Sequence, residues 1–183
     1  MAKRFDRIGE DHRAFIEAQH IFFVGSAARE GRVNVSPKGM DSLRVTGPNR
    51  IVWRNLTGSG NETAGHLRDI NRMTLMWCGF ELRPLILRCY GTARAVHPRD
   101  ADWAALNGLF PPHDGARQVY DMSVDLVQTS CGYAVPFMDH AGERDTLDRW
   151  TADKGPEGVR RYWAETNART LDGFETGIGD DPA

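Results

Sequence analysis

The sequence Thr57-Gly-Ser-Gly-Asn-Glu-Thr63 lies between an apolar stretch, Ile51–Arg54, and a segment with the composition of a helix. Ser59 and Glu62 have the spacing of a capping box, and Asn61 is an alternative N-cap. Exposed amides at a helix N-terminus form a site for an anion such as phosphate. The stretch has neither the ending of a P-loop nor a G-x-G-x-x-G pattern. A glycine-rich turn before a capped helix is therefore the alternative interpretation.

On both sides of this loop, short apolar or alternating stretches predict strands. These strands are expected over residues 20–24, 33–36, 43–45, 51–54, 73–78, 85–96 and 122–128. Helices are expected over residues 6–19, from the glycine-rich loop to about 71, and over 98–109, 145–154 and 156–167. Short turns rather than regularly spaced helices join most of the strands. This arrangement favours a mainly β fold, an antiparallel barrel with peripheral helices, over a doubly wound sheet.

Composition limits the number of domains and the classes of partner. The chain has 183 residues, of which 40% are hydrophobic and 26% charged, so we expect one domain over residues 1–183 with a disordered tail from about residue 174. The formal net charge is -2 and the isoelectric point is about 6.3. Neither value favours nucleic acid or an anionic membrane as a partner. The balance is typical of a protein that handles small molecules.

The chain shows no apolar run of the roughly 18 residues that cross a bilayer, and its N-terminus lacks the apolar centre of a signal peptide. We therefore expect a cytoplasmic protein. Cys78, Cys89 and Cys131 are odd in number and have no C-x-x-C spacing, so buried free thiols are expected. None of the six histidines shows a recognised ligand spacing, and no metal site is predicted.

Basic residues in three predicted strands strengthen the phosphate interpretation. Lys38 and Arg54 each end a strand, and Arg88 interrupts the apolar run Leu85–Tyr90. A barrel can bring all three to one rim, where a cluster of cations and backbone donors suits a phosphate. The alternative is that each is a separate, solvated surface side chain.

Several motifs in a fixed order then indicate a family. They are Val33-Asn-Val-Ser-Pro-Lys-Gly39, Ile51-Val-Trp-Arg-Asn55, Asn61-Glu-Thr-Ala-Gly-His-Leu67, Asn71-Arg-Met-Thr-Leu-Met-Trp77, Leu87-Arg-Cys-Tyr-Gly91 and Ser130-Cys-Gly-Tyr-Ala-Val-Pro136. From about Phe15 to Gly173 the chain resembles the pyridoxamine 5'-phosphate oxidase-like FMN-binding split barrels. The resemblance is to a branch distinct from the true pyridoxamine phosphate oxidases.

The resemblance implies an antiparallel six-stranded split β-barrel that binds FMN at the interface of a homodimer. In that family one strand lies along the flavin, the next contributes two consecutive residues, and a helix start holds the phosphate. With Arg88 added from the basic cluster, the expected cofactor-binding residues are Val35, Ser36, Lys38, Trp53, Arg54, Asn61, Glu62, Thr63 and Arg88.

Two departures separate the chain from the true oxidases. Those enzymes place an Arg-Lys pair where this chain has Glu62-Thr63, so two positive charges are missing at the phosphate. Arg54 or Arg88 can replace them, or the side chains of Asn61 and Thr63 and the helix amides can hold the phosphate alone. The C-terminal Arg-x-His element that grips pyridoxal phosphate also has no counterpart. Vitamin B6 oxidation is therefore not predicted.

The leading hypothesis is an FMN-dependent oxidoreductase that acts on an unidentified small molecule, with a nicotinamide nucleotide as the candidate electron donor. Flavin chemistry needs no acid or base from the protein, so no catalytic residue is assigned. Two alternatives stay open. One is a flavin-binding or stress-related protein without turnover, and the other is a split barrel that binds haem or a deazaflavin.

Overall fold

The computed structural model describes residues 2–81 and 83–178, which form eight strands and four helices. In chain order these are β1 (Lys3–Phe5), α1 (Glu10–Glu17), β2 (Phe22–Ser26), β3 (Asn34–Lys38), β4 (Leu43–Gly47), β5 (Arg50–Leu56), α2 (Glu62–Asp69), β6 (Met73–Cys78), β7 (Leu85–Val96), α3 (Trp103–Asn107), β8 (Ala116–Cys131) and α4 (Thr146–Thr166).

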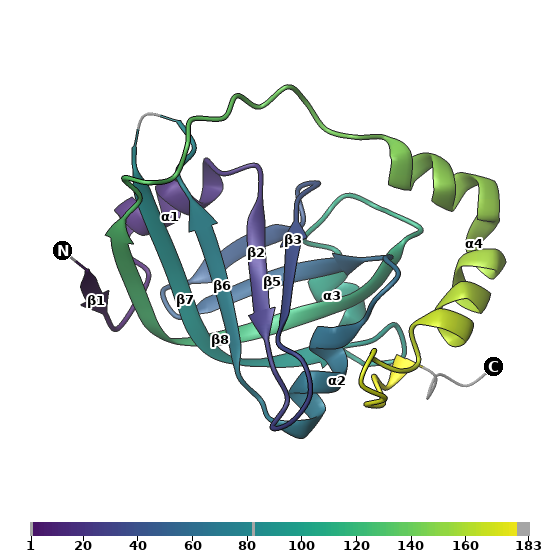
Figure 1. Cartoon of the computed structure of the whole chain (residues 1–183). Helices are drawn as coiled ribbons and strands as arrows, with labels where there is room; N and C mark the ends of the chain where they lie inside the picture. The colour runs from purple at the N-terminus through teal and green to yellow at the C-terminus, as the bar shows by residue number, and fades with distance from the viewer. Residues whose placement is uncertain (1, 82, 179–183) are drawn as a thin grey trace.

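All strands belong to one antiparallel sheet with the order β3-β2-β6-β7-β8-β5-β4, and β1 pairs with β8. The sheet curls until the edge strand β3 approaches β5, where Lys38 Nζ donates to Asn55 Oδ1 at 3.2 Å (Figure 1). No ladder joins β3 to β5 among the described residues, so the barrel is split there. The predicted split-barrel class is confirmed. The strand number is eight rather than six, partly because the charged segment Lys3–Phe5 forms a strand that no apolar pattern marks.

Alternation along the strands decides which side chains fill the barrel. Ile51, Trp53 and Asn55 of β5 face the interior, where the Trp53 ring stacks on Tyr120 with centroids 4.3 Å apart. Val52 of the same strand faces outward and packs with α3. The two faces of β5 therefore belong to two different apolar clusters, a main one inside the barrel and a smaller one beneath α3.

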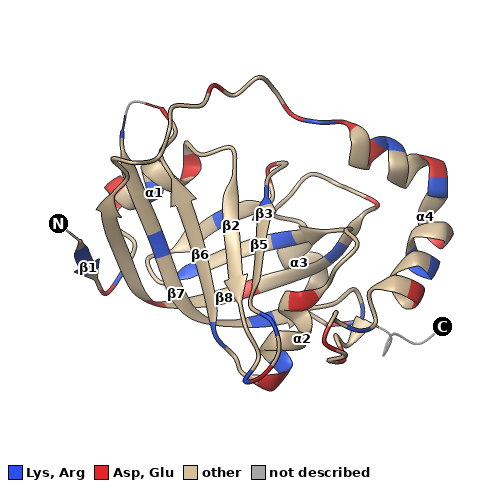
Figure 2. Ribbon diagram, in the orientation of Figure 1, with Lys and Arg blue, Asp and Glu red and all other residues tan. Residues whose placement is uncertain are grey.

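Several predicted elements differ in length. α3 covers only Trp103–Asn107 of the expected 98–109, and β8 begins at Ala116 rather than Met122. By contrast, the two expected C-terminal helices, 145–154 and 156–167, are both present within α4, where a non-helical Gly155 with φ of +65° separates them. Glycine adopts such a φ without strain and so allows the bend. Acidic and basic residues alternate along α4, as expected for a solvated helix (Figure 2).

Residues 132–145 form an extended segment, here called the strap, that arches from the end of β8 to α4 (Figure 1). After α4 the chain folds back toward α2. The tail expected from residue 174 is packed as far as Ile178, whose side chain contacts Val159 and Trp163. Residues 179–183, also expected to be disordered, lie outside the described residues.

Two further expectations can be compared with the structure. No helix in residues 2–81 and 83–178 combines the length and the apolar character needed to cross a membrane. The three cysteines are free, and Cys78 and Cys89 are buried as expected. The prediction was wrong for Cys131, which is exposed because it ends β8 where the strap begins.

Candidate functional site

A polar cavity of about 340 Å³ lies between the end of β3, the Gly58–Gly60 loop and the start of α2. Five of the predicted residues line it together: Ser36, Lys38, Asn61, Glu62 and Thr63. Asn34, Asn55 and Arg117 also line it, although the sequence analysis did not select them. The glycine-rich loop and the end of the flanking strand therefore line one cavity, and their contact with a cofactor stays a prediction.

Arg117 forms the buried wall of this cavity. It lies on β8 with only 1% of its surface exposed. Its guanidinium donates to Asn167 Oδ1 at 2.6 Å and to the carbonyl oxygens of Gly60 at 3.0 Å and Gly58 at 3.3 Å. No described carboxylate pairs with it, and its Nε lacks a hydrogen-bond partner in the described chain. Burial lowers the pKa of Arg117 to about 10.

Lys38 enters the cavity from β3 and begins a chain of buried polar groups. Its Nζ donates to Asn55 Oδ1, and Asn55 Nδ2 donates to Gln118 Oε1 at 3.1 Å. The Tyr120 hydroxyl donates to the same Gln118 oxygen at 3.4 Å. Burial, followed by the positive charge of Arg117, lowers the pKa of Lys38 to about 8. A half-buried cation beside a second, fully buried cation favours an anionic occupant.

The C-terminal segment holds the glycine-rich loop in place. Asn167 is fully buried, and its Nδ2 donates to the carbonyl oxygens of Gly58 and Ser59 at 3.0 and 3.4 Å. Asn61 Nδ2 donates back to the Asn167 carbonyl at 3.2 Å. The loop and Arg117 are therefore both positioned by one asparagine that lies 50 residues after Arg117.

The N-terminus of α2 points its first amides toward the same region. Asn61 occupies the N-cap position, but no described side chain caps the helix. The capping box predicted from Ser59 and Glu62 was therefore wrong. The Glu62 carboxylate instead accepts the Leu171 amide, with both oxygens at 3.2 Å, and so links α2 to the C-terminal segment. Uncapped amides at a helix start suit an anion.

Thr63, in the first turn of α2, is buried and forms hydrogen bonds to residues of β2 and β3. Its hydroxyl accepts hydrogen bonds from Ser26 Oγ at 3.3 Å and Asn34 Nδ2 at 3.4 Å. Ser26 Oγ also lies 3.1 Å from His66 Nδ1. The first turn of α2 is thus fixed against β2 and β3 by buried hydrogen bonds.

Four predicted residues lie outside this cavity. Val35 projects outward from β3 and is 63% exposed. Trp53 is fully buried in the barrel, because the inward-facing positions of β5 include residue 53. The resemblance implied that Val35 and Trp53 contact a flavin, but neither residue lines this cavity.

Arg54 and Arg88 are separated from the cavity by strand alternation. Arg54 lies on the α3 side of β5, where it donates to the Pro111 carbonyl and its guanidinium lies 5.1 Å from the centroid of Phe110. Arg54 lines a separate cavity of about 260 Å³, which Lys38 also borders. Arg88 faces away from the core neighbours Leu87 and Cys89 and donates to Ser130 Oγ at 3.2 Å. The expectation that all three cations meet at one rim is therefore wrong for Arg88.

A larger cavity of about 670 Å³ adjoins the polar one between the barrel, the strap and α4. The two share Pro37, Lys38, Gly58 and Ser59 as lining residues. Trp150 and Tyr162 of α4 add aromatic surface to the larger cavity. Both volumes fall within the size range of small-molecule sites.

Comparison with known proteins agrees with this geometry. The family model described as pyridoxamine 5'-phosphate oxidase matches residues 8–131. A pyridoxamine 5'-phosphate oxidase family protein, ustO of Aspergillus flavus, is 32% identical over 191 residues, covering 93% of this chain and 76% of the relative. The chain belongs to the pyridoxamine 5'-phosphate oxidase family.

Solved structures of low sequence identity share the fold. HupZ of Group A Streptococcus aligns with a TM-score of 0.51 and 19% identity, covering 65% of this chain and 91% of that one. A candidate pyridoxamine 5'-phosphate oxidase from Lactobacillus delbrueckii aligns with a TM-score of 0.53 and 14% identity, covering 67% and 94%.

Within this member of the pyridoxamine 5'-phosphate oxidase family, Arg117 is the main residue that the sequence analysis missed. The predicted strand began at Met122, so Arg117 lay outside every expected strand, whereas it belongs to β8. One signal was available, because Arg117 stands in the stretch Ala116-Arg-Gln-Val-Tyr120 much as Arg88 stands in its own apolar run. Asn55 and Asn167 carried no comparable signal, since asparagine is common in turns and at helix ends.

Proposed function

We propose that the chain binds FMN, with the phosphate in the 340 Å³ cavity, and that it acts as a flavin-dependent oxidoreductase on a small molecule. The observation that carries the proposal is Arg117, a buried arginine without a described carboxylate partner beside an uncapped helix start. The described hydrogen-bond partners of Arg117 are neutral oxygens, and a buried cation without an anionic partner is costly.

The residues present fit a phosphate. Lys38 and Arg117 supply two positive charges, and a phosphate monoester carries close to two negative charges at neutral pH. Arg117 thereby replaces the Arg-Lys pair that the true oxidases have where this chain has Glu62-Thr63. The Glu62 carboxylate is engaged by the Leu171 amide, so residue 62 can offer its backbone N–H to the anion.

The polar chain behind Lys38 adds neutral hydrogen-bonding groups to the wall of the same cavity. Gln118 is completely buried, and its Nε2 has no partner among the described residues. An unmade hydrogen bond of this kind costs about 1–3 kcal/mol, which a bound acceptor or a water recovers. Asn55 lines the cavity and is held from behind by Gln118, so Asn55 can hydrogen-bond to a ligand there.

When bound, FMN supplies hydride or electron-pair transfer at its N5 atom. The chain's own contribution is to hold the phosphate and to orient the ring. The 670 Å³ cavity between the barrel and α4 adjoins Lys38 and is the proposed place for the substrate, with a nicotinamide nucleotide as the proposed electron donor.

The proposal includes a homodimer. β3 is an edge strand, and its Val35 is 63% exposed while the preceding Val33 is 73% exposed. Exposed apolar residues on a sheet edge favour association with another chain. Sedimentation velocity at micromolar concentration should give a dimer, and a monomer at all concentrations would argue against this part of the proposal.

The test is a visible spectrum of the protein purified without added cofactor, followed by FMN titration and assay of nicotinamide nucleotide oxidation with an artificial acceptor. Flavin bands and turnover support the whole proposal. Flavin bands without turnover for any donor support a flavin-binding protein that is not an enzyme. A Soret band, or a colourless protein indifferent to FMN, would refute FMN as the cofactor.

A further inference from the structure

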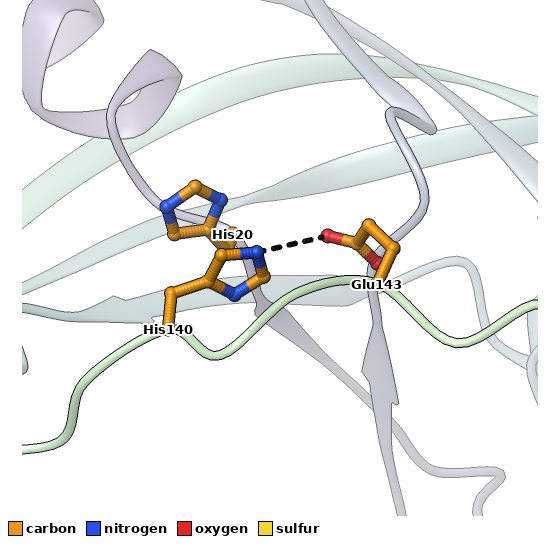
Figure 3. Close-up of side chains that lie close together, drawn as sticks. All are labelled: His20, His140 and Glu143. Carbon is orange, nitrogen blue, oxygen red and sulfur yellow. Dashed lines mark ion pairs between the residues drawn. The ribbon is translucent and has the colours of Figure 1, made fainter.

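Three side chains that could hold a metal ion meet at the edge of the larger cavity. They are His20, His140 and Glu143, and one ligand atom from each lies within 4.8 Å of the others (Figure 3). The two imidazole rings stack with centroids 3.7 Å apart and an angle of 9° between their planes. His140 Nε2 lies 3.8 Å from Glu143 Oε1. The group is separate from Arg117 and from the polar cavity.

The three residues come from two distant parts of the chain. His20 lies between α1 and β2, whereas His140 and Glu143 belong to the strap. The backbone of residues 139–144 makes no hydrogen bond to the rest of the described chain. The His20–His140 stack is a contact between this half of the strap and the barrel. A separation of 120 residues also explains why no ligand spacing was visible in the sequence.

The donor set has the composition of a zinc site. Two imidazoles and one carboxylate bind Zn²⁺ in several catalytic centres, where a fourth position stays open to water or substrate. Zinc–ligand distances of about 2.0–2.2 Å place tetrahedral donors about 3.4 Å apart. The present separations, at most 4.8 Å, exceed that value by no more than about 1.4 Å. Rotation of the exposed side chains can close this gap, because the second torsion of histidine is soft.

We infer that His20, His140 and Glu143 form a binding site for one divalent transition-metal ion of the Zn²⁺ class. All three line the cavity between the barrel and α4, so the open fourth position faces that cavity. Metal binding would tilt the imidazoles out of their stack and fix the strap to the barrel. The bound ion would then set the shape of one wall of the cavity.

Isothermal titration of ZnCl2 into tag-free, EDTA-treated full-length protein, without FMN, tests the site. One ion per chain is expected, and Mg²⁺ is expected to bind far more weakly because it prefers oxygen ligands. His20→Ala, His140→Ala and Glu143→Gln should each weaken Zn²⁺ at least about tenfold, since even outer-shell partners contribute that much. His12→Gln, a histidine outside the group, is the matched control and should bind like the unaltered chain.

Proteolysis gives a readout that does not depend on affinity. Arg144 is exposed on the strap, so trypsin cleavage after Arg144 should slow at least several-fold when Zn²⁺ is added. His20→Ala, which alters the barrel and not the strap, should abolish this protection. Zinc affinity equal in all three variants and the control, or protection that survives in His20→Ala, would overturn the inference.

Discussion

Replacing Lys38 by methionine should stabilise the cofactor-free protein and weaken FMN binding. The Lys38 ammonium is half-buried beside Arg117, and desolvation lowers its pKa from about 10.5 to about 8. Each pKa unit corresponds to about 1.4 kcal/mol, so keeping this lysine charged at neutral pH costs up to about 3 kcal/mol. The hydrogen bond to Asn55 offsets about 1 kcal/mol. Lys38→Met should therefore raise the free energy of unfolding at pH 7 by about 2 kcal/mol.

The pH dependence follows from the sign of the shift. Between about pH 8 and 10.5 the unfolded chain keeps the Lys38 proton while the folded chain releases it. The free energy of unfolding of the unaltered protein therefore rises with pH through this window. Below about pH 8 the folded protein carries the full cost of a charged Lys38. The advantage of Lys38→Met should shrink toward zero near pH 10.

Urea denaturation of cofactor-free protein at pH 7 and pH 10 measures both effects, with Lys154→Met on exposed α4 as the control. FMN titration of the same variants measures the predicted loss of cofactor affinity. The Lys38→Met variant should bind FMN at least about tenfold more weakly than the unaltered protein. A variant less stable than the unaltered protein at pH 7, or an equal advantage at both pH values, would refute the reasoning about a buried uncompensated charge.

Three more predictions concern the same site. Arg117→Met should weaken FMN at least about tenfold by fluorescence titration, because charged hydrogen bonds contribute about 1.5–3 kcal/mol, whereas Arg88→Met should leave the affinity unchanged. Equal losses in both arginine variants would contradict the assignment. Asn167→Ala releases the glycine-rich loop and should lower both FMN affinity and the urea midpoint; full affinity would show that the loop holds its shape without Asn167. Trp53→Phe should destabilise the core by about 1–3 kcal/mol in urea while FMN affinity stays within about twofold. A large loss of affinity there would place Trp53 against the flavin.

The sequence predicted the parts of the fold that local patterns determine. Residues 73–78 and 85–96 were expected as strands and are β6 and β7, because their apolar content and the intervening turn act over short range. The length of α3 was wrong, because the helix ends at Asn107, and Phe110 reaches the smaller apolar cluster from the segment that follows it. β1 could not be expected, because its charged residues gain strand structure only by pairing with β8.

The candidate site was predicted in part for the same reason. Ser36, Lys38 and Asn61 lie in motifs of consecutive residues and were selected together. Arg117 and Asn167 reach the cavity only through the sheet order and the return of the C-terminal segment, which are tertiary features. The prediction that Arg88 joins the other two cations was wrong because the face on which a strand residue lies depends on the strand's register. A shift of one residue moves every side chain of a strand to the opposite face of the sheet.

The most direct test of the central claim compares FMN with riboflavin, which lacks the phosphate, in fluorescence-quenching titrations of the full-length protein at low salt. A phosphate held by Arg117, Lys38 and the α2 amides predicts FMN affinity in the micromolar range or tighter and riboflavin affinity at least about tenfold weaker. The same comparison in Arg117→Met should show most of that difference lost. Equal affinity for the two flavins, or no quenching by either, would contradict the assignment of the cavity as an FMN phosphate site.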